Sequence, residues 1–265
     1  SSYRPKADLY HNHLYLILHF PVYNKDNGSD FSKSAEEDFV LGSKFIITVH
    51  YDQIKPLKEF FKQCQIDEEL KEKLFQNTHS GFLLFNILRN LYKSVNEELD
   101  VIQDKIDAIE KELFDGRERE MLERISFLRR DLVDFERAIS MHEPIFLSLE
   151  KSGSILFGDE FSPYLRELAS EYLKIKNIFN GDKAALESLY DTNNSIFSAK
   201  TNDAMKTLSI MAFVTFPLML ISSLFGMNTK VLPIVGSEND FWVIIGIMLV
   251  GMVAMFAFFK KKKWL

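Results

Sequence analysis

The residues with the most chemical content lie at helical spacing near the C-terminus. Steps of three or four positions from Asn202 lead to Met205, Leu208, Ala212, Phe216, Met219 and Ser223, and then to Gly226, Met227 and Asn228. This stripe has a side-chain amide at each end and is apolar between them, with small hydroxyls. Amide rings around an apolar constriction are typical of a pore for hydrated ions. Ordinary helix-packing stripes have the same periodicity, so spacing alone leaves both interpretations open.

Other groups that could do chemistry are sparse. The sequence contains no phosphate loop, no Ser/His/Asp arrangement and no paired histidines at helical spacing. His11 and His13 would share one face of a strand, but a metal would need a third ligand. Cys64 is the sole cysteine, which excludes a disulfide framework and a cysteine-based metal site. We therefore expect no enzymatic activity and no nucleic-acid partner.

Two uncharged stretches must position the stripe. Leu208–Phe225 and Trp242–Phe259 each contain eighteen residues without a charge. At the helical rise of about 1.5 Å per residue, each reaches about 27 Å, near the thickness of a bilayer's hydrocarbon core. We predict two membrane spans joined by an extracellular or periplasmic loop at 226–241, rather than two buried helices of a soluble protein.

The flanking charges predict the orientation of these spans. Lysines follow the second span, at Lys260, Lys261, Lys262 and Lys263, and precede the first, at Lys200 and Lys206. The loop has Lys230 opposed by Glu238 and Asp240. By the positive-inside rule, the long N-terminal part and the basic tail at 260–265 lie in the cytoplasm. We expect a multi-pass protein of the cell (inner) membrane.

Residues 1–80 have the pattern of a partial cytoplasmic α/β domain. Leu14–Phe20 is a continuous apolar run, as in a strand covered on both faces. Asn24–Asp30 is rich in turn formers. We also expect a hairpin of Phe39–Leu41 and Phe45–Val49, and short helices at Leu57–Gln63 and Asp67–Gln76. The chain begins with Ser1 rather than methionine, so the domain looks truncated.

Residues 81–151 predict a long antiparallel helical hairpin. Apolar residues alternate by four and three positions from Leu88 to Leu113, and again from Ile125 to Ile139. Asp115-Gly116 interrupts the pattern and marks the turn. Ser152–Asp159 is expected to be a Gly/Ser-containing connection.

A very long helix is predicted over 160–225. Its apolar positions begin at Leu165 and run into the first span, and Gly181 alone does not end a helix. At about sixty residues it would be about 90 Å long and could not bury both faces within one chain. We expect an oligomer whose stalk helices surround an axis.

The whole pattern resembles the CorA family of divalent-cation channels. The resemblance is carried by Asn202, Met205, Lys206 and Leu208 at the entry, by Pro217, by Phe225-Gly226-Met227-Asn228, and by the Lys-Trp-Leu ending after the second span. It implies a homopentameric funnel that imports Mg²⁺, with Asn228 at the outer mouth. Asn202, Met205 and Leu208 would then form the cytoplasmic constriction, and Lys260–Lys263 a basic collar around the stalk.

The resemblance also implies regulation by intracellular Mg²⁺. The matching stalk acids are Asp191 and, less closely, Glu167, with a partner acid from the loop at Asp26 or Asp30. Carboxylates facing each other across subunits would repel, and bound Mg²⁺ would hold the ring closed.

Three departures from the family pattern leave alternatives open. A glutamate usual in the loop is absent, since the loop reads Leu232-Pro233-Ile234, so Glu238 and Asp240 would have to attract cations. Met219 occupies a position that is often threonine, and about a hundred N-terminal residues of the family domain are missing. The alternatives are other cargoes (Co²⁺, Ni²⁺), a zinc transporter like ZntB, or a membrane-anchored coiled-coil scaffold that conducts nothing.

Overall fold

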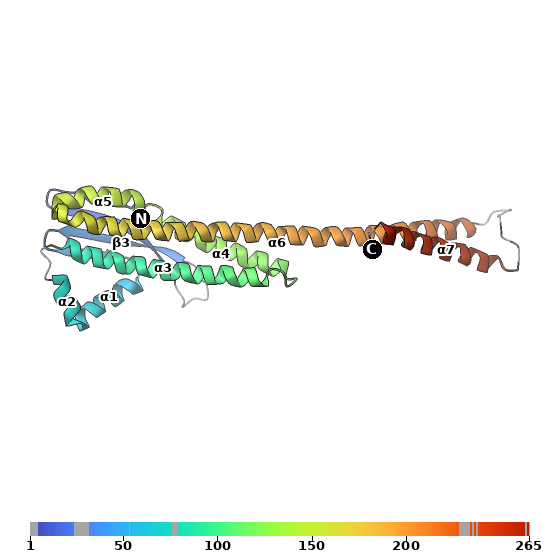
Figure 1. Ribbon diagram of the computed structural model, residues 1–265, viewed down its shortest axis with the longest axis horizontal. Helices are drawn as coiled ribbons and strands as arrows, with labels where there is room; N and C mark the ends of the chain where they lie inside the picture. The colour runs from blue at the N-terminus through green and yellow to red at the C-terminus, as the bar shows by residue number, and fades with distance from the viewer. Residues whose placement is uncertain are drawn as a thin grey trace. The chain divides into compact units, whose positions relative to one another are not determined.

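The computed structural model describes residues 5–23, 32–52, 54–75, 79–227, 234, 236, 238–262 and 264. The chain forms two compact units, Ser1–Asn193 and Asn194–Leu265. The boundary falls inside one long helix, so the polypeptide passes from unit to unit without a loop. Figure 1 shows the elements in chain order from blue to red.

The N-terminal unit contains a four-stranded antiparallel sheet with the order β1-β2-β3-β4. Its strands are β1 (Lys6–Leu9), β2 (His13–Tyr23), β3 (Ser32–Gly42) and β4 (Ile46–His50). Within the predicted run Leu14–Phe20, every residue except half-buried Tyr15 is buried, which fits a strand covered on both faces. The β3–β4 hairpin is confirmed, whereas β1 was not predicted because its four residues show no periodic pattern. The loop Asn24–Asp30 lies outside the described residues.

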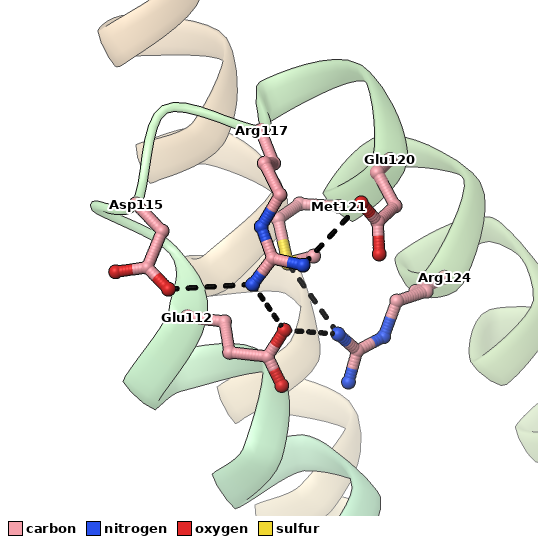
Figure 2. Close-up of polar contacts among 6 residues, drawn as sticks. All are labelled: Glu112, Asp115, Arg117, Glu120, Met121 and Arg124. Carbon is pink, nitrogen blue, oxygen red and sulfur yellow. Dashed lines mark hydrogen bonds and ion pairs between the residues drawn. The ribbon is translucent and has the colours of Figure 1, made fainter.

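Two short helices, α1 (Lys55–Ile66) and α2 (Glu68–Phe75), lead into the predicted hairpin of α3 (Gly81–Glu112) and α4 (Glu118–Ile139). The periodic apolar residues of both helices are buried, including Leu99 and Phe135. Gly116 has φ 85°, a conformation that a residue with a Cβ rarely adopts, and it makes the turn. Ion pairs surround this turn: Arg117 contacts Glu112, Asp115 and Glu120, and Arg124 also contacts Glu112 (Figure 2).

The connection expected at Ser152–Asp159 is instead largely helical, because α5 extends over His142–Phe157. Its small residues permit close packing rather than forming a loop: a Cβ on Gly153 would lie 2.8 Å from Leu165 Cδ1. Ser154 donates its hydroxyl proton to the Glu150 carbonyl, which a helix tolerates. The helix stops at Gly158, where φ is 87°.

The predicted stalk is confirmed as one helix. After a short 3₁₀ turn, η2 (Asp159–Phe161), α6 runs for 64 residues from Ser162 to Phe225 and includes Pro217. A second apolar helix, α7, spans Asp240–Lys261. Among the described residues, only these two helices are long and apolar enough to cross a membrane.

Candidate functional site

One side of α6 packs against α7 in the C-terminal unit. Ile210 and Val214 are buried there with Phe259 of α7. Leu218 on α6 and Met252 and Met255 on α7 extend this contact. This contact identifies the face of α6 that packs against α7.

The predicted stripe lies on the opposite face. Each residue of a helix advances by about 100°, so Ala212 and Phe216 point about 200° away from Ile210 and Val214, respectively. Met205, Leu208, Phe216 and Met219 are between 57% and 66% exposed, and Asn202 and Ser223 are also exposed. A single chain therefore leaves this apolar face uncovered, with an amide at its Asn202 end.

The stripe presents fewer hydroxyls than its sequence suggests. The Ser209 hydroxyl donates to the Met205 carbonyl at 2.9 Å, one turn back along α6. Because this hydroxyl proton is used within the helix, the face between Asn202 and Ser223 is dominated by methionine, leucine and phenylalanine side chains.

The helix ends at the predicted filter motif. The amide of Gly226 donates to the Ser222 carbonyl at 3.0 Å, and that of Met227 to the Leu224 carbonyl at 3.4 Å. A Cβ at position 226 would lie 3.2 Å from the Ser222 oxygen, so glycine allows the carbonyls of the last turn to approach closely. Met227 is exposed. Asn228, predicted to coordinate the ion's hydration shell, lies outside the described residues.

The loop acids differ in what they do. Asp240 accepts hydrogen bonds from the backbone amides of Gly236 at 3.2 Å and Phe241 at 2.7 Å, so it stabilises the first turn of α7. Glu238 is exposed and is the more available of the two for attracting cations. That Glu238 and Asp240 attract cations to the mouth stays a prediction.

The basic ending completes α7. Lys260 and Lys261 form its last turn and Lys262 follows, where positive charge suits the negative end of the helix dipole. Trp264 folds back and stacks on Phe259 with ring centroids 6.0 Å apart. Lys263 lies outside the described residues.

The predicted sensor acids are far apart within one chain. Asp191 and Glu167 are both exposed on α6 and stand 24 positions apart, about 36 Å along the helix. They cannot share one ion in the same chain. Their predicted partners, Asp26 and Asp30, lie outside the described residues. Within the described part of the chain, no three acidic, histidine or cysteine side chains are placed to hold a metal.

His11 is not placed as predicted. Strand β2 begins at His13, so His11 precedes the strand rather than alternating with His13 along it. The His13 ring stacks on Tyr10, with centroids 5.1 Å apart. The expected shared strand face is therefore wrong, because the chain bends at Asn12 before the ladder starts.

Three buried hydrogen bonds had no signal in the sequence. His142 Nε2 lies 2.8 Å from the His19 carbonyl, which can only accept, so Nδ1 is left to accept the Tyr92 hydroxyl proton at 2.6 Å. Burial lowers the His142 pKa to about 3, which keeps the ring neutral. Buried Asn193 donates to the Glu118 carbonyl at 3.0 Å and fastens the start of α4 to α6.

Comparisons with known proteins agree with this architecture. The family described as CorA-like Mg²⁺ transporter protein matches residues 1–261. The cobalt/magnesium transport protein CorA of Thermotoga maritima is 26% identical over 265 residues, covering 99% of this chain and 73% of its own length. The zinc transport protein ZntB of Yersinia pestis is 25% identical over 242 residues, covering 90% of this chain and 72% of its own length.

The fold has a solved counterpart. The complete structure of the CorA magnesium transporter from Methanocaldococcus jannaschii superposes with a TM-score of 0.85 at 22% identity, over 98% of this chain and 80% of that one. The family match makes the apolar end of α6 and helix α7 membrane-spanning segments. The chain therefore belongs to the CorA family of divalent-cation transporters.

Proposed function

We propose that the chain is one subunit of a homopentameric channel that admits hydrated Mg²⁺ into the cell. The observation that carries the proposal is the uncovered face of α6, opposite α7, with Asn202 at one end and exposed Met205, Leu208 and Phe216 along it. Five such faces around an axis would enclose an apolar path. An apolar constriction of this kind can close by losing its water.

In this proposal the Gly226-Met227-Asn228 motif is the outer filter. Asparagine amides can hydrogen-bond the water shell of an ion without stripping it, which suits Mg²⁺ because Mg²⁺ gives up its waters reluctantly. Exposed Glu238 would raise the local cation concentration at the mouth. The N-terminal unit and the basic tail would both lie in the cytoplasm, with Lys260–Lys262 at the inner surface.

Regulation would occur between subunits. Since Asp191 and Glu167 are about 36 Å apart along one helix, an ion held by either needs an acid from elsewhere. A neighbouring subunit could bring its loop with Asp26 and Asp30 to one of them. Bound Mg²⁺ would offset the repulsion of these carboxylates and hold the stalks together.

The second candidate cargo is Zn²⁺, favoured by the similarity to the zinc transport protein ZntB. A flux panel separates the two: proteoliposomes containing the chain are given Mg²⁺, Co²⁺, Ni²⁺ or Zn²⁺ and uptake is followed with ion-sensitive dyes. The proposal expects Mg²⁺ uptake that excess Zn²⁺ does not abolish. Uptake of Zn²⁺ alone would replace Mg²⁺ by Zn²⁺ as the cargo, and no uptake of any ion would favour a scaffold that conducts nothing.

A further inference from the structure

An open cavity lies in the N-terminal unit, and none of the stripe residues lines it. It has a volume of about 590 Å³ and lies between α1, α3 and α6. This size is within the usual range for small-molecule sites. Three cationic side chains line it, Arg89 and Lys93 from α3 and Lys174 from α6, against one acid, Glu171. The chain as a whole has a net charge of −6, so this concentration of positive charge is local.

Helix α3 turns one polar face toward the cavity. Asn86, Arg89, Asn90, Lys93 and Asn96 all line it, and their spacing of three and four residues places them on one side of the helix. The neighbouring face of α3, with Leu88 and Leu91, is buried in the core. The helix therefore presents alternating amides and cations to the cavity, rather than the mixed acids and bases of an ordinary solvated face.

Hydrogen bonds within the protein determine which atoms of two of these amides remain available to a ligand. Asn86 Nδ2 donates to the Phe82 carbonyl at 2.7 Å, and Asn90 Nδ2 donates to the Pro56 carbonyl at 3.4 Å. Since these NH₂ groups are engaged, the two side-chain oxygens remain as acceptors. The cavity thus combines cationic donors for an anionic group with amide acceptors for hydroxyl or amino groups, above an apolar floor of buried Phe60 and Ile175.

One acid lies among these cations. Glu171 lies 3.8 Å from Arg89; burial raises the pKa of its carboxyl, whereas the charges of Arg89 and Lys174 lower it. Lys93 pairs with Glu97 at 3.9 Å, but both side chains are well exposed, so this pair is easily exchanged. Lys174 forms no ion pair with any residue that the structure describes.

We propose that this cavity binds a phosphate-bearing small molecule of the nucleotide class. Arg89, Lys93 and Lys174 would hold the phosphates, the Asn86 and Asn90 oxygens would accept protons from the sugar or base, and Phe60 and Ile175 would lie under its apolar part. The inference does not depend on which ion the chain transports, because binding is measured without transport.

The test is titration calorimetry on the full chain in detergent, in magnesium-free buffer with EDTA, using ATP and tripolyphosphate as separate probes. We expect saturable ATP binding that weakens as salt rises. The double variant Lys93→Gln/Lys174→Gln should raise the ATP Kd by about tenfold or more. Lys151→Gln, which alters an exposed lysine on α5, is the matched control and should leave the Kd unchanged.

The two probes show whether the nucleoside contributes to binding or whether the phosphate chain alone is bound. If tripolyphosphate binds more weakly than ATP, the nucleoside contributes to binding, as the proposal expects. If tripolyphosphate binds as tightly as ATP, the site holds the phosphate chain alone, which would overturn the assignment to the nucleotide class. No saturable binding of either probe at millimolar concentration would overturn it, as would a Kd that the double variant leaves unchanged. If the double variant unfolds by circular dichroism, Lys174→Gln alone should still raise the Kd several-fold.

Discussion

Asp182 is an unusual side chain in the stalk helix because it is charged at neutral pH and almost fully buried. It is 6% exposed, and its Oδ2 has no hydrogen-bond partner among the described residues. Burial, together with Asp100 and Asp107 on α3, raises the pKa of its carboxyl to about 6. The packing of α3 on α6 therefore works against a charge that the unfolded chain would solvate freely.

This geometry predicts a pH dependence of stability. A folded pKa raised above the ordinary value of 3.8 means that the folded chain binds the proton more tightly, so stability falls as pH rises from about 4 to about 6. Asp182→Asn should remove this loss and raise the free energy of unfolding at pH 7.5 by about 1–2 kcal/mol. Thermal unfolding of the detergent-solubilised protein across this pH range measures it.

Exposed Asp104 on α3 supplies the control, since Asp104→Asn should leave the pH dependence as it is. An Asp182→Asn protein that keeps the wild-type slope between pH 4 and pH 6 would show that another group titrates.

Helical periodicity predicts which residues of α6 share a face, and their role as a pore lining stays a prediction. Asn202, Met205, Leu208 and Phe216 lie on the side of α6 away from α7, which the packing of Ile210 and Val214 on Phe259 shows and the spacing did not. Periodicity does not predict the roles of single polar groups. Asp240 accepts hydrogen bonds from two backbone amides, and this depends on the local path of the chain, which produces no periodic pattern in the sequence.

At the scale of elements, a buried histidine links a strand and the helices of the N-terminal unit by hydrogen bonds. His142 on α5 donates to β2 at the His19 carbonyl and accepts from Tyr92 on α3. Tyr172 on α6 packs beside the His142 ring, with centroids 5.9 Å apart. Three elements therefore meet α6 around one neutral imidazole.

We predict that Tyr92→Phe destabilises the unit without changing its fold. The change leaves His142 Nδ1 as a buried acceptor without a donor, which costs about 1–3 kcal/mol. Urea unfolding followed by circular dichroism measures the loss. Because Phe keeps the ring contacts with Phe20 and Phe146, a loss of more than about 4 kcal/mol would indicate that packing, not the hydrogen bond, was removed.

The long periodic elements, the two short helices α1 and α2 and the β3–β4 hairpin were predicted, whereas strand β1 and the helical end of α5 were not. The helical hairpin and α6 follow from apolar repeats that persist for many turns, and the structure confirms them. The end of α5 was mistaken for a loop because Ser152, Gly153 and Ser154 have the composition of one. Their helical state depends on tertiary contact, Gly153 fitting against Leu165, which local sequence does not record.

At the scale of the whole molecule, a single chain leaves an apolar surface uncovered. Helix α7 packs on only one face of the membrane-spanning part of α6, and the stripe stays exposed. The proposed pentamer resolves this by turning five stripes toward a common axis. The same arrangement would bring stalk acids of neighbouring subunits together, so assembly and regulation would share one interface.

The regulatory proposal predicts that Mg²⁺ protects the N-terminal unit from proteolysis. A ligand that binds the assembled state stabilises it, so millimolar Mg²⁺ should slow cleavage of the wild type several-fold. Asp191→Lys should abolish the difference between samples with and without Mg²⁺, because a tethered ammonium replaces the ion. Glu187→Lys, one turn away on α6, is the control and should retain the Mg²⁺ effect. Protection that persists in Asp191→Lys would place the sensor elsewhere.

The most direct test of the channel itself is Mg²⁺ uptake into proteoliposomes, with an internal magnesium dye, for the wild type beside Asn228→Ala. The account predicts uptake by the wild type and at least about a tenfold loss in the variant, with the oligomer unchanged by size-exclusion chromatography. Undiminished uptake through Asn228→Ala would contradict the assignment of the filter to Gly226-Met227-Asn228, and a well-formed wild-type oligomer that conducts no Mg²⁺ would contradict the proposed channel.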